Sequence, residues 1–247
     1  MTSLPNIDTD FMLNFLVELL NTPSPTGFTE AAIRFTKNTL SSFSNLTVSH
    51  TRKGALVITL PGLRDDAPRG LTAHIDTLGA MVKEIKSNGR LKLTKLGGYP
   101  WNTVEGEGCL VFSRDDGEVR GSLLHIQASV HVHGSKVGEN KREDDNMEVR
   151  LDVRTSSAEE TAKYGIQVGD FVAFDPRVEV SNGFIRSRHL DDKACVANII
   201  AALKAIHDAG DQPAQTTTIL ISNYEEVGHG AAAGFPPEMT ELVAVDM

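Results

Sequence analysis

The stretch DKACVANIIAALKAIHDAG (residues 192–210), followed by TTTILIS (residues 216–222), decides the fold class of this chain. Apolar or small side chains recur through the first stretch at the spacing of a buried helix, and the dipeptide Ala209-Gly210 is a helix stop signal. The second stretch is rich in β-branched and aliphatic residues, which is typical of a buried strand. A buried helix that leads into a buried strand predicts an α/β layer.

The same pattern occurs at the other end of the chain. Apolar residues at helical spacing predict a helix that begins after a cap at Asp8 or Thr9, and a second helix over residues 29–40. Strand-like runs follow at residues 46–48, 55–60 and 71–75. Residues 61–70, PGLRDDAPRG, predict a turn between two of them. Both ends of the sequence therefore predict parts of one α/β domain.

Short strand-like runs separated by Gly, Asn and Asp turns fill the middle of the chain. They lie at residues 82–85, 91–93, 109–112, 123–126, 149–153 and 171–174. Strands at this spacing predict a small β-barrel or sandwich, and His131 and His133 fall on a predicted exposed strand within it. We therefore expect residues 1–82 and 183–247 to form one discontinuous domain, with residues 83–182 inserted into it.

Composition excludes several classes of protein. The 247 residues carry 24 Lys and Arg against 33 Asp and Glu, a net charge of −9, without a Lys/Arg block. Because phosphate groups are bound by clustered positive charge, we expect no nucleic-acid partner and no membrane partner. The N-terminus lacks the basic residues of a signal peptide, and no run approaches the ~18 apolar residues of a membrane span. Cys109 and Cys195 are too few for a disulfide framework, so the sequence predicts a cytoplasmic protein with reduced thiols.

Side chains of the kinds that bind metals stand where strands or buried runs end. They are His74 and Asp76 in LTAHID, Asp191 and Asp192 in HLDDK, Glu225 and Glu226 after TTTILISNY, and Asp246 in LVAVDM. Because the carboxyl ends of parallel strands form the ligand crevice of an α/β sheet, these side chains can converge. Several carboxylates and one imidazole are costly to desolvate without a cation, so together they predict a metal site.

Each cluster alone has a simpler interpretation. His74 fits a hydrogen-bonded core histidine, Asp191-Asp192 fits a helix cap, and Glu225-Glu226 fits a solvated helix start. His229, three residues after Glu226, fits either a wall of the site or a surface turn. Paired carboxylates also occur in glycosidases, which need neither an imidazole nor a metal. The joint occurrence of the clusters favours the metal site over these alternatives.

The order of the motifs AHIDTLG, SRHLDDK, NYEEVGHGA and VAVDM resembles the M42 family of metalloaminopeptidases, of the glutamyl or deblocking type. The resemblance covers essentially the whole chain. It implies a zinc-peptidase-like three-layer α/β domain, which is the catalytic domain, interrupted by a small β-barrel-like domain. It also implies a homo-oligomer and two divalent metal ions, zinc or cobalt.

The resemblance further implies how the metals are held. His74, Asp191 and Asp246 would hold one ion. Asp191 would bridge to a second ion, which Glu226 would also bind. These assignments come from the matching positions of the family motifs in this sequence.

The remaining site residues receive roles in the reaction from the same resemblance. Glu225 would be the general base that activates the attacking water, and Asp76 would orient His74. Asp192 receives no direct metal bond. The implied activity is the release of N-terminal residues from peptides, whose free α-amino group an acidic site attracts.

The chain departs from the family pattern at several positions. Thr77, Lys193 and Cys195 stand where Glu, Arg and Gly are common. The family supplies a final His ligand from beyond the fourth motif, whereas this chain ends at Met247, so we expect a C-terminally truncated member. The motifs HIDTLGAMVK, SRHLDDK and EEVGHGA resemble those of an M42 subgroup that is associated with the osmoprotectant N-acetylglutaminylglutamine amide. Two alternatives follow: an amide hydrolase that acts on a small osmolyte dipeptide, and a truncated, inactive binding or assembly module.

Overall fold

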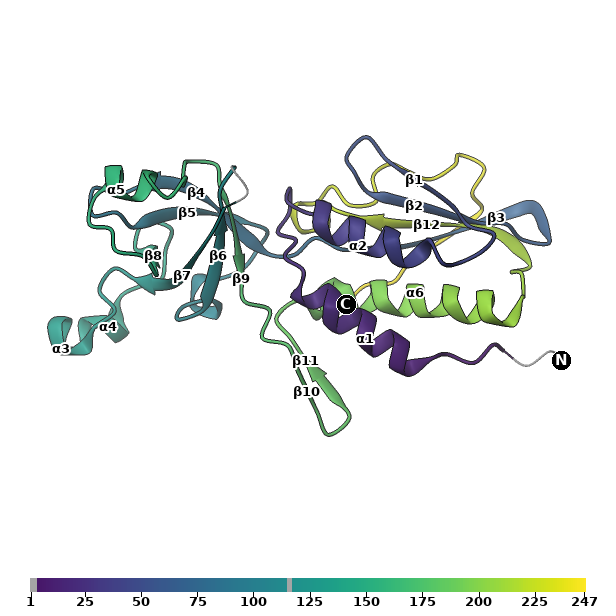
Figure 1. The fold of residues 1–247 in the computed structure, drawn as a ribbon, viewed down its shortest axis with the longest axis horizontal. Coiled ribbons are helices and arrows are strands. Elements are labelled where there is room, and N and C mark those ends of the chain that lie inside the picture. The colour runs from purple at the N-terminus through teal and green to yellow at the C-terminus, as the bar shows by residue number, and fades with distance from the viewer. Residues whose placement is uncertain (1–3, 115–116) are drawn as a thin grey trace. The chain divides into compact units, whose positions relative to one another are not determined.

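The computed structural model describes residues 4–114 and 117–247, which form two compact units. The chain up to Thr77 and from Pro176 onward forms the α/β unit, and Leu78–Asp175 form the barrel unit. The predicted α/β fold interrupted by a β-barrel is confirmed (Figure 1). The barrel unit starts at Leu78 rather than at residue 83, because its first strand, β4 (Gly79–Ile85), pairs with a barrel strand from end to end.

A five-stranded sheet forms the centre of the α/β unit. Its strands in spatial order are β1 (Thr47–His50), β2 (Leu56–Leu60), β12 (Gln215–Ser222), β3 (Arg64–His74) and β13 (Glu241–Ala244). Strands β12, β3 and β13 run parallel to one another, whereas β2 is antiparallel to both β1 and β12. The carboxyl ends of the three parallel strands therefore lie at one edge of the sheet, where α/β folds place their ligand crevices.

Three helices share an apolar core with this sheet: α1 (Thr9–Asn21), α2 (Glu30–Leu40) and α6 (Leu190–Ala209). Figure 1 shows α1 and α6 side by side beneath the sheet. Asp8 caps α1, as predicted, by accepting a hydrogen bond of 2.9 Å from the Phe11 N–H. Gly210 ends α6 in the left-handed conformation, with a φ of 64°, which glycine adopts without strain. The sequence signals at these helix ends are confirmed.

The predicted turn over residues 61–70 is wrong for most of its length, because β3 already begins at Arg64. The polar residues at its start are held by side chains of the neighbouring strand. Gln215 Oε1 accepts from the Ala67 N–H (3.2 Å), and Gln215 Nε2 donates to Asp66 Oδ1 (2.8 Å). Tertiary hydrogen bonds therefore extend a segment whose composition alone favours a turn.

A small hairpin that the sequence patterns did not predict precedes α6. Its strands are β10 (Glu179–Ser181) and β11 (Phe184–Arg186). The turn between them consists of Asn182 and Gly183, with φ values of 51° and 81°. Two successive left-handed residues are what a tight two-residue hairpin requires, so the Asn-Gly pair was the available signal.

A closed six-stranded barrel forms the second unit. Its strands in order are β4, β5 (Leu91–Leu96), β8 (Met147–Leu151), β7 (Glu118–His125), β6 (Gly108–Phe112) and β9 (Phe171–Phe174). Closure pairs every strand on both sides and leaves no open edge. The interior is filled by buried side chains such as Leu91, Val111, Leu123 and Val149. Two short elements, η1 (Trp101–Thr103) and α5 (Ala158–Ala162), also belong to this unit.

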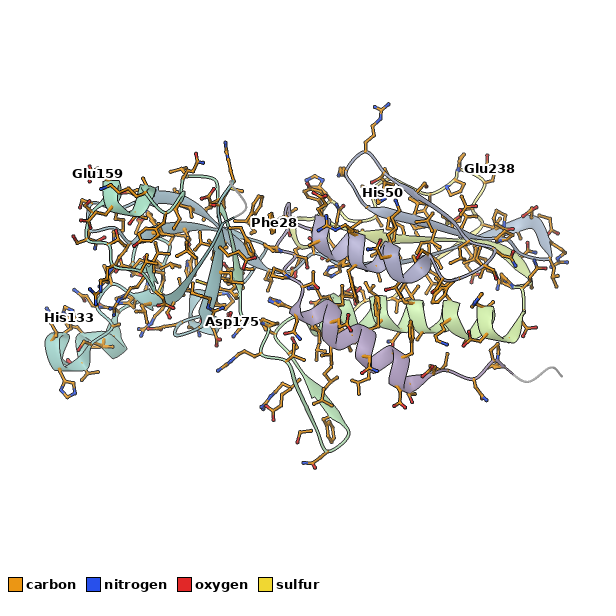
Figure 2. All side chains as sticks on the ribbon, viewed as in Figure 1. Phe28, His50, His133, Glu159, Asp175 and Glu238 are labelled. Carbon is orange, nitrogen blue, oxygen red and sulfur yellow. The ribbon has the colours of Figure 1, made fainter. Side chains whose placement is uncertain are left out.

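Two further short helices, α3 (Val130–His133) and α4 (Lys136–Glu139), follow β7. The expectation of a strand at His131 and His133 is wrong. The backbone of this segment is satisfied locally, since the His133 N–H donates to the Ser129 carbonyl (2.9 Å). Figure 2 shows His133 on α3, outside the barrel strands. Across the described residues, no helix has both the length and the apolar character needed to cross a membrane.

Candidate metal centre

The candidate site lies at the carboxyl edge of the parallel strands. His74 is the last residue of β3, and Glu225 begins the short helix η2 (Glu225–Val227), which follows β12. Asp246 comes two residues after β13, and Asp191 lies in the first turn of α6. The parallel pairing of β12, β3 and β13 therefore brings His74, Glu225 and Asp246 together, and the start of α6 adds Asp191.

Three acidic side chains surround one nitrogen of His74. Its Nε2 lies 3.1 Å from Asp191 Oδ1, 3.7 Å from Glu225 Oε2 and 3.9 Å from Asp246 Oδ1. Ligand atoms of His74, Asp191 and Asp246 all lie within 4.8 Å of one another. The imidazole is 2% exposed, whereas the three acids are between 41% and 52% exposed. The cluster thus has a buried base and a rim that solvent and a ligand can reach.

Asp76, which is completely buried, contacts His74 of this cluster. The Nδ1 atom of His74 lies 3.0 Å from the Asp76 carbonyl oxygen and 3.5 Å from Asp76 Oδ1. The carboxylate of Asp76 accepts hydrogen bonds from the Thr26 hydroxyl (2.7 Å) and from the backbone N–H groups of Glu225 (3.1 Å) and Glu226 (3.3 Å). Asp76 therefore fixes both the imidazole and the backbone that carries the two glutamates.

The electrostatics of the cluster favour a bound positive charge. Burial lowers the pKa of His74, but the hydrogen bond and charge of Asp76 and the charge of Asp192 outweigh it and raise the pKa to about 9. Burial, together with the charges of Asp191, Asp76 and Glu225, raises the pKa of Glu226 to about 7, against the opposing effect of His74. His74 and Glu226 therefore hold protons that a cation can replace.

The lysine next to the cluster does not neutralise it. Lys193 is completely buried and donates hydrogen bonds to the backbone carbonyls of Leu19 (2.9 Å) and Thr22 (2.7 Å) at the end of α1. Burial lowers the pKa of its amine to about 7. Within the described chain, the ion pairs of Asp191 and Asp246 are with His74. The negative charge of the site is therefore not balanced by the lysine that stands beside it in the sequence.

The donor set fits a divalent metal ion. One imidazole nitrogen and several carboxylate oxygens are ligands that zinc and similar ions accept. Carboxylates whose charge is left uncompensated in a partly buried site gain most from such an ion. A cavity of about 310 Å³ adjoins the cluster. Its lining includes His74, Glu225 and Asp246 together with small residues such as Gly230, Ala231 and Ala232.

The sequence patterns did not indicate Thr26, which contacts Asp76 in the site, and they left open a role for His229, which lies outside it. Thr26 follows two prolines in a segment that predicted only the end of a helix, and no local pattern marks its contact with Asp76. His229 is exposed and its backbone N–H donates to the Tyr224 carbonyl (2.9 Å). Within the described residues, the group with metal-ligand spacing is His74, Asp191 and Asp246, without His229.

Comparison with known proteins places this sequence in a family. The family model described as M42 glutamyl aminopeptidase matches residues 54–247. The Bacillus subtilis (strain 168) protein named "Putative aminopeptidase YhfE" is 46% identical over 236 residues, which cover 95% of this chain and 68% of that protein.

Solved structures show the same fold at low sequence identity. A TET aminopeptidase from a marine sediment Thaumarchaeota archaeon matches with a TM-score of 0.80 and 21% identity, over 90% of this chain and 60% of that one. The Pyrococcus horikoshii TET1 peptidase matches with a TM-score of 0.78 and 21% identity, over 95% of this chain and 68% of that one. The chain therefore spans about two thirds of the length of these relatives. Because the family model covers most of the sequence, the chain belongs to the M42 glutamyl aminopeptidase family.

Proposed function

We propose that the protein is a metal-dependent aminopeptidase that releases N-terminal residues from peptides through a water activated at a two-metal centre. The observation that carries this proposal is the cluster of three acids, Asp191, Glu225 and Asp246, around the Nε2 atom of His74, in a chain of the M42 family. The discontinuous α/β unit is then the catalytic domain, and the barrel unit is the inserted domain.

His74, Asp191 and Asp246 would hold one divalent ion, zinc or cobalt, and Asp191 and Glu226 would hold a second. The spacing of the first three ligands supports the first site. The raised pKa of Glu226 supports the second, since an acid destabilised by neighbouring acids gains from a cation. When bound, such ions polarise a carbonyl group and lower the pKa of water.

The residues of this chain supply the proton transfer and the selection of the substrate. Glu225 is at the rim of the cluster and its backbone is fixed by Asp76, so its carboxylate can take a proton from water and return it to the leaving amine. Asp191 and Asp246 present negative charge that attracts the free α-amino group of a peptide. The adjoining cavity of about 310 Å³ gives room for the N-terminal residue.

The proposed setting is a homo-oligomer in the cytoplasm. The TET1 peptidase from Pyrococcus horikoshii can assemble into a tetrahedron or a large octahedral shell, which supports self-association of this related chain. Cys109 and Cys195 are buried free thiols, which supports a reducing compartment.

The test combines metal content with product release. Metal-free protein is reloaded with zinc or cobalt, bound metal is measured by elemental analysis, and release of N-terminal residues is followed for peptides with free and with N-acetylated termini. We expect chelator-sensitive release from free-amine peptides. His74→Ala should lose the metal, whereas His229→Ala, which changes an exposed histidine outside the cluster, should keep it.

Other results would point to the alternatives. Metal-dependent release from N-acetylated dipeptide amides alone would identify an amide hydrolase for a small osmolyte. A chain that binds no metal and releases nothing would be a binding or assembly module. Chelator-resistant turnover would remove the metal from the mechanism.

A further inference from the structure

Asp192 is a second buried carboxylate beside the metal cluster, and the mechanism proposed above does not use it. It follows Asp191 in the first turn of α6. The two neighbours differ sharply, because the side chain of Asp191 is 52% exposed whereas Asp192 is completely buried. The side chain of Asp192 therefore points into the protein, whereas that of Asp191 points toward the rim of the site.

The buried carboxylate of Asp192 binds the main chain of a predicted metal ligand. Its Oδ2 atom accepts a hydrogen bond of 2.9 Å from the His74 N–H, across 118 residues of sequence. Pairing between β3 and β13 ends at Thr72 and Ala244, so the His74 N–H lies beyond that ladder and needs another acceptor. Asp192 provides it and so joins the end of β3 to the start of α6.

This bond completes a three-point attachment of His74. The main-chain N–H is held by Asp192, the ring Nδ1 lies 3.0 Å from the Asp76 carbonyl oxygen, and the ring Nε2 faces Asp191 at 3.1 Å. Because Asp191 and Asp192 are adjacent, the segment that carries one ligand also fixes the backbone of the other. The separation of the two ligands thus depends on Asp192.

Among the described residues, the second oxygen of Asp192 adds no hydrogen bond to the fold, and the same holds for the second oxygen of the buried Asp170 in the barrel unit. In the described structure, the Oδ1 atom of Asp192 is buried and lacks a hydrogen-bond partner. A buried polar atom without a partner destabilises the fold, by about 1–3 kcal/mol for a typical group. The hydrogen bond from the His74 N–H to Oδ2 is therefore the contact on which the role of Asp192 rests.

We propose that Asp192 is a positioning residue of the metal centre, which sets the separation of His74 and Asp191 through the His74 N–H without binding the metal itself. This inference rests on the metal centre proposed above, but not on the peptide substrate. Partners of metal-binding histidines typically change metal affinity 10–100-fold when they are lost.

The experiment compares two substitutions of similar volume in the full chain. Asp192→Asn keeps an oxygen that accepts from the His74 N–H, whereas Asp192→Leu removes it. Zinc affinity is measured by competition with a chromophoric chelator, and thermal unfolding of the metal-free protein is measured in parallel. We expect Asp192→Leu to weaken zinc binding 10–100-fold and Asp192→Asn to stay within about threefold of the wild type.

Asp170 in the barrel unit provides the matched control. It is 2% exposed, and its Oδ2 atom accepts from the backbone N–H of Gln167 at 2.8 Å. Asp170→Leu should lower the unfolding temperature without changing zinc affinity, because it perturbs a buried carboxylate outside the cluster.

Several outcomes would overturn the proposal. Unchanged zinc affinity in Asp192→Leu would show that the bond does not set the ligand separation. Equal loss in Asp192→Asn and Asp192→Leu would show that charge, and not the acceptor, is what matters. If Asp192→Leu fails to fold, the comparison of Asp192→Asn with the wild type decides, since an intact acceptor must preserve affinity. A wild-type chain that binds no zinc would refute the metal centre itself, which is a different result.

Discussion

Glu148 in the barrel unit and the acids around His74 in the α/β unit differ in their partners. In the barrel unit, the buried Glu148 forms ion pairs with both Lys86 and Arg90. In the α/β unit, the buried Asp76 and Asp192 bind backbone N–H groups and lie beside His74, and further acids surround that imidazole. The barrel acid has two basic partners of its own, whereas the acids of the α/β cluster share the single imidazole of His74. The difference indicates that Glu148 serves the fold and that the cluster serves a ligand.

Substitution of Glu225 should have the largest effect and leave the fold intact. Glu225→Gln removes the proposed general base, so we expect kcat/KM to fall about 10²- to 10⁴-fold while zinc content is retained. Steady-state kinetics on a free-amine peptide and elemental analysis measure the two quantities. Full turnover in this variant would mean that another group moves the proton.

Substitution of Glu148 should lower the stability of the protein and leave its activity unchanged. Glu148→Gln leaves Lys86 and Arg90 without their buried counter-charge, so we expect a loss of about 2–3 kcal/mol in the free energy of unfolding. Activity per folded molecule should stay at the wild-type value. Urea unfolding and kinetics on the same preparation test this, and a variant that loses activity while keeping its stability would contradict the assignment of Glu148 to the fold.

The metal-free protein should lose stability as the pH rises from 3.8 to about 7. The folded-state pKa values of Glu226, about 7, and Asp192, about 6, lie above their ordinary values because burial disfavours their charged forms. The contribution of such groups is complete below the ordinary pKa and is lost as the pH passes the raised one. We expect a decrease on the order of 2 kcal/mol in urea unfolding, which zinc should reverse.

Glu226→Gln provides the control for this pH dependence. It removes one of the two titrating groups, so the slope of stability against pH should become shallower over the same range. An unchanged slope would assign the pH dependence to other groups.

Thr26 should contribute the smallest effect of this set. Thr26→Val removes the hydroxyl that donates to buried Asp76, and we expect a loss of about 1–2 kcal/mol in unfolding free energy. Thr26→Ser keeps the donor and should stay close to the wild type. Equal stability of the two variants would show that the backbone N–H groups of Glu225 and Glu226 satisfy Asp76 on their own.

Most of the regular structure is predictable from the sequence because it depends on local signals. The apolar period of α6, its stop at Gly210 and the cap at Asp8 all act within a few residues, and all are confirmed. The predictions that failed concern segments governed by distant partners or by their own backbone bonds. The start of β3 is held by Gln215, and the residues around His131 close a local helical turn in place of a strand.

The sequence by itself determined which chemical groups stand at the strand ends and at the start of α6. His74, Glu225 and Asp246 come at or after the ends of recognisable apolar runs, and Asp191 precedes one. Only the tertiary structure decided how these groups are held. The bond from His74 to Asp192 joins residues 118 positions apart, and it exists because β3 meets the start of α6 at one edge of the sheet. Strand order and the placement of helices follow from packing of the whole chain, which a local pattern does not encode.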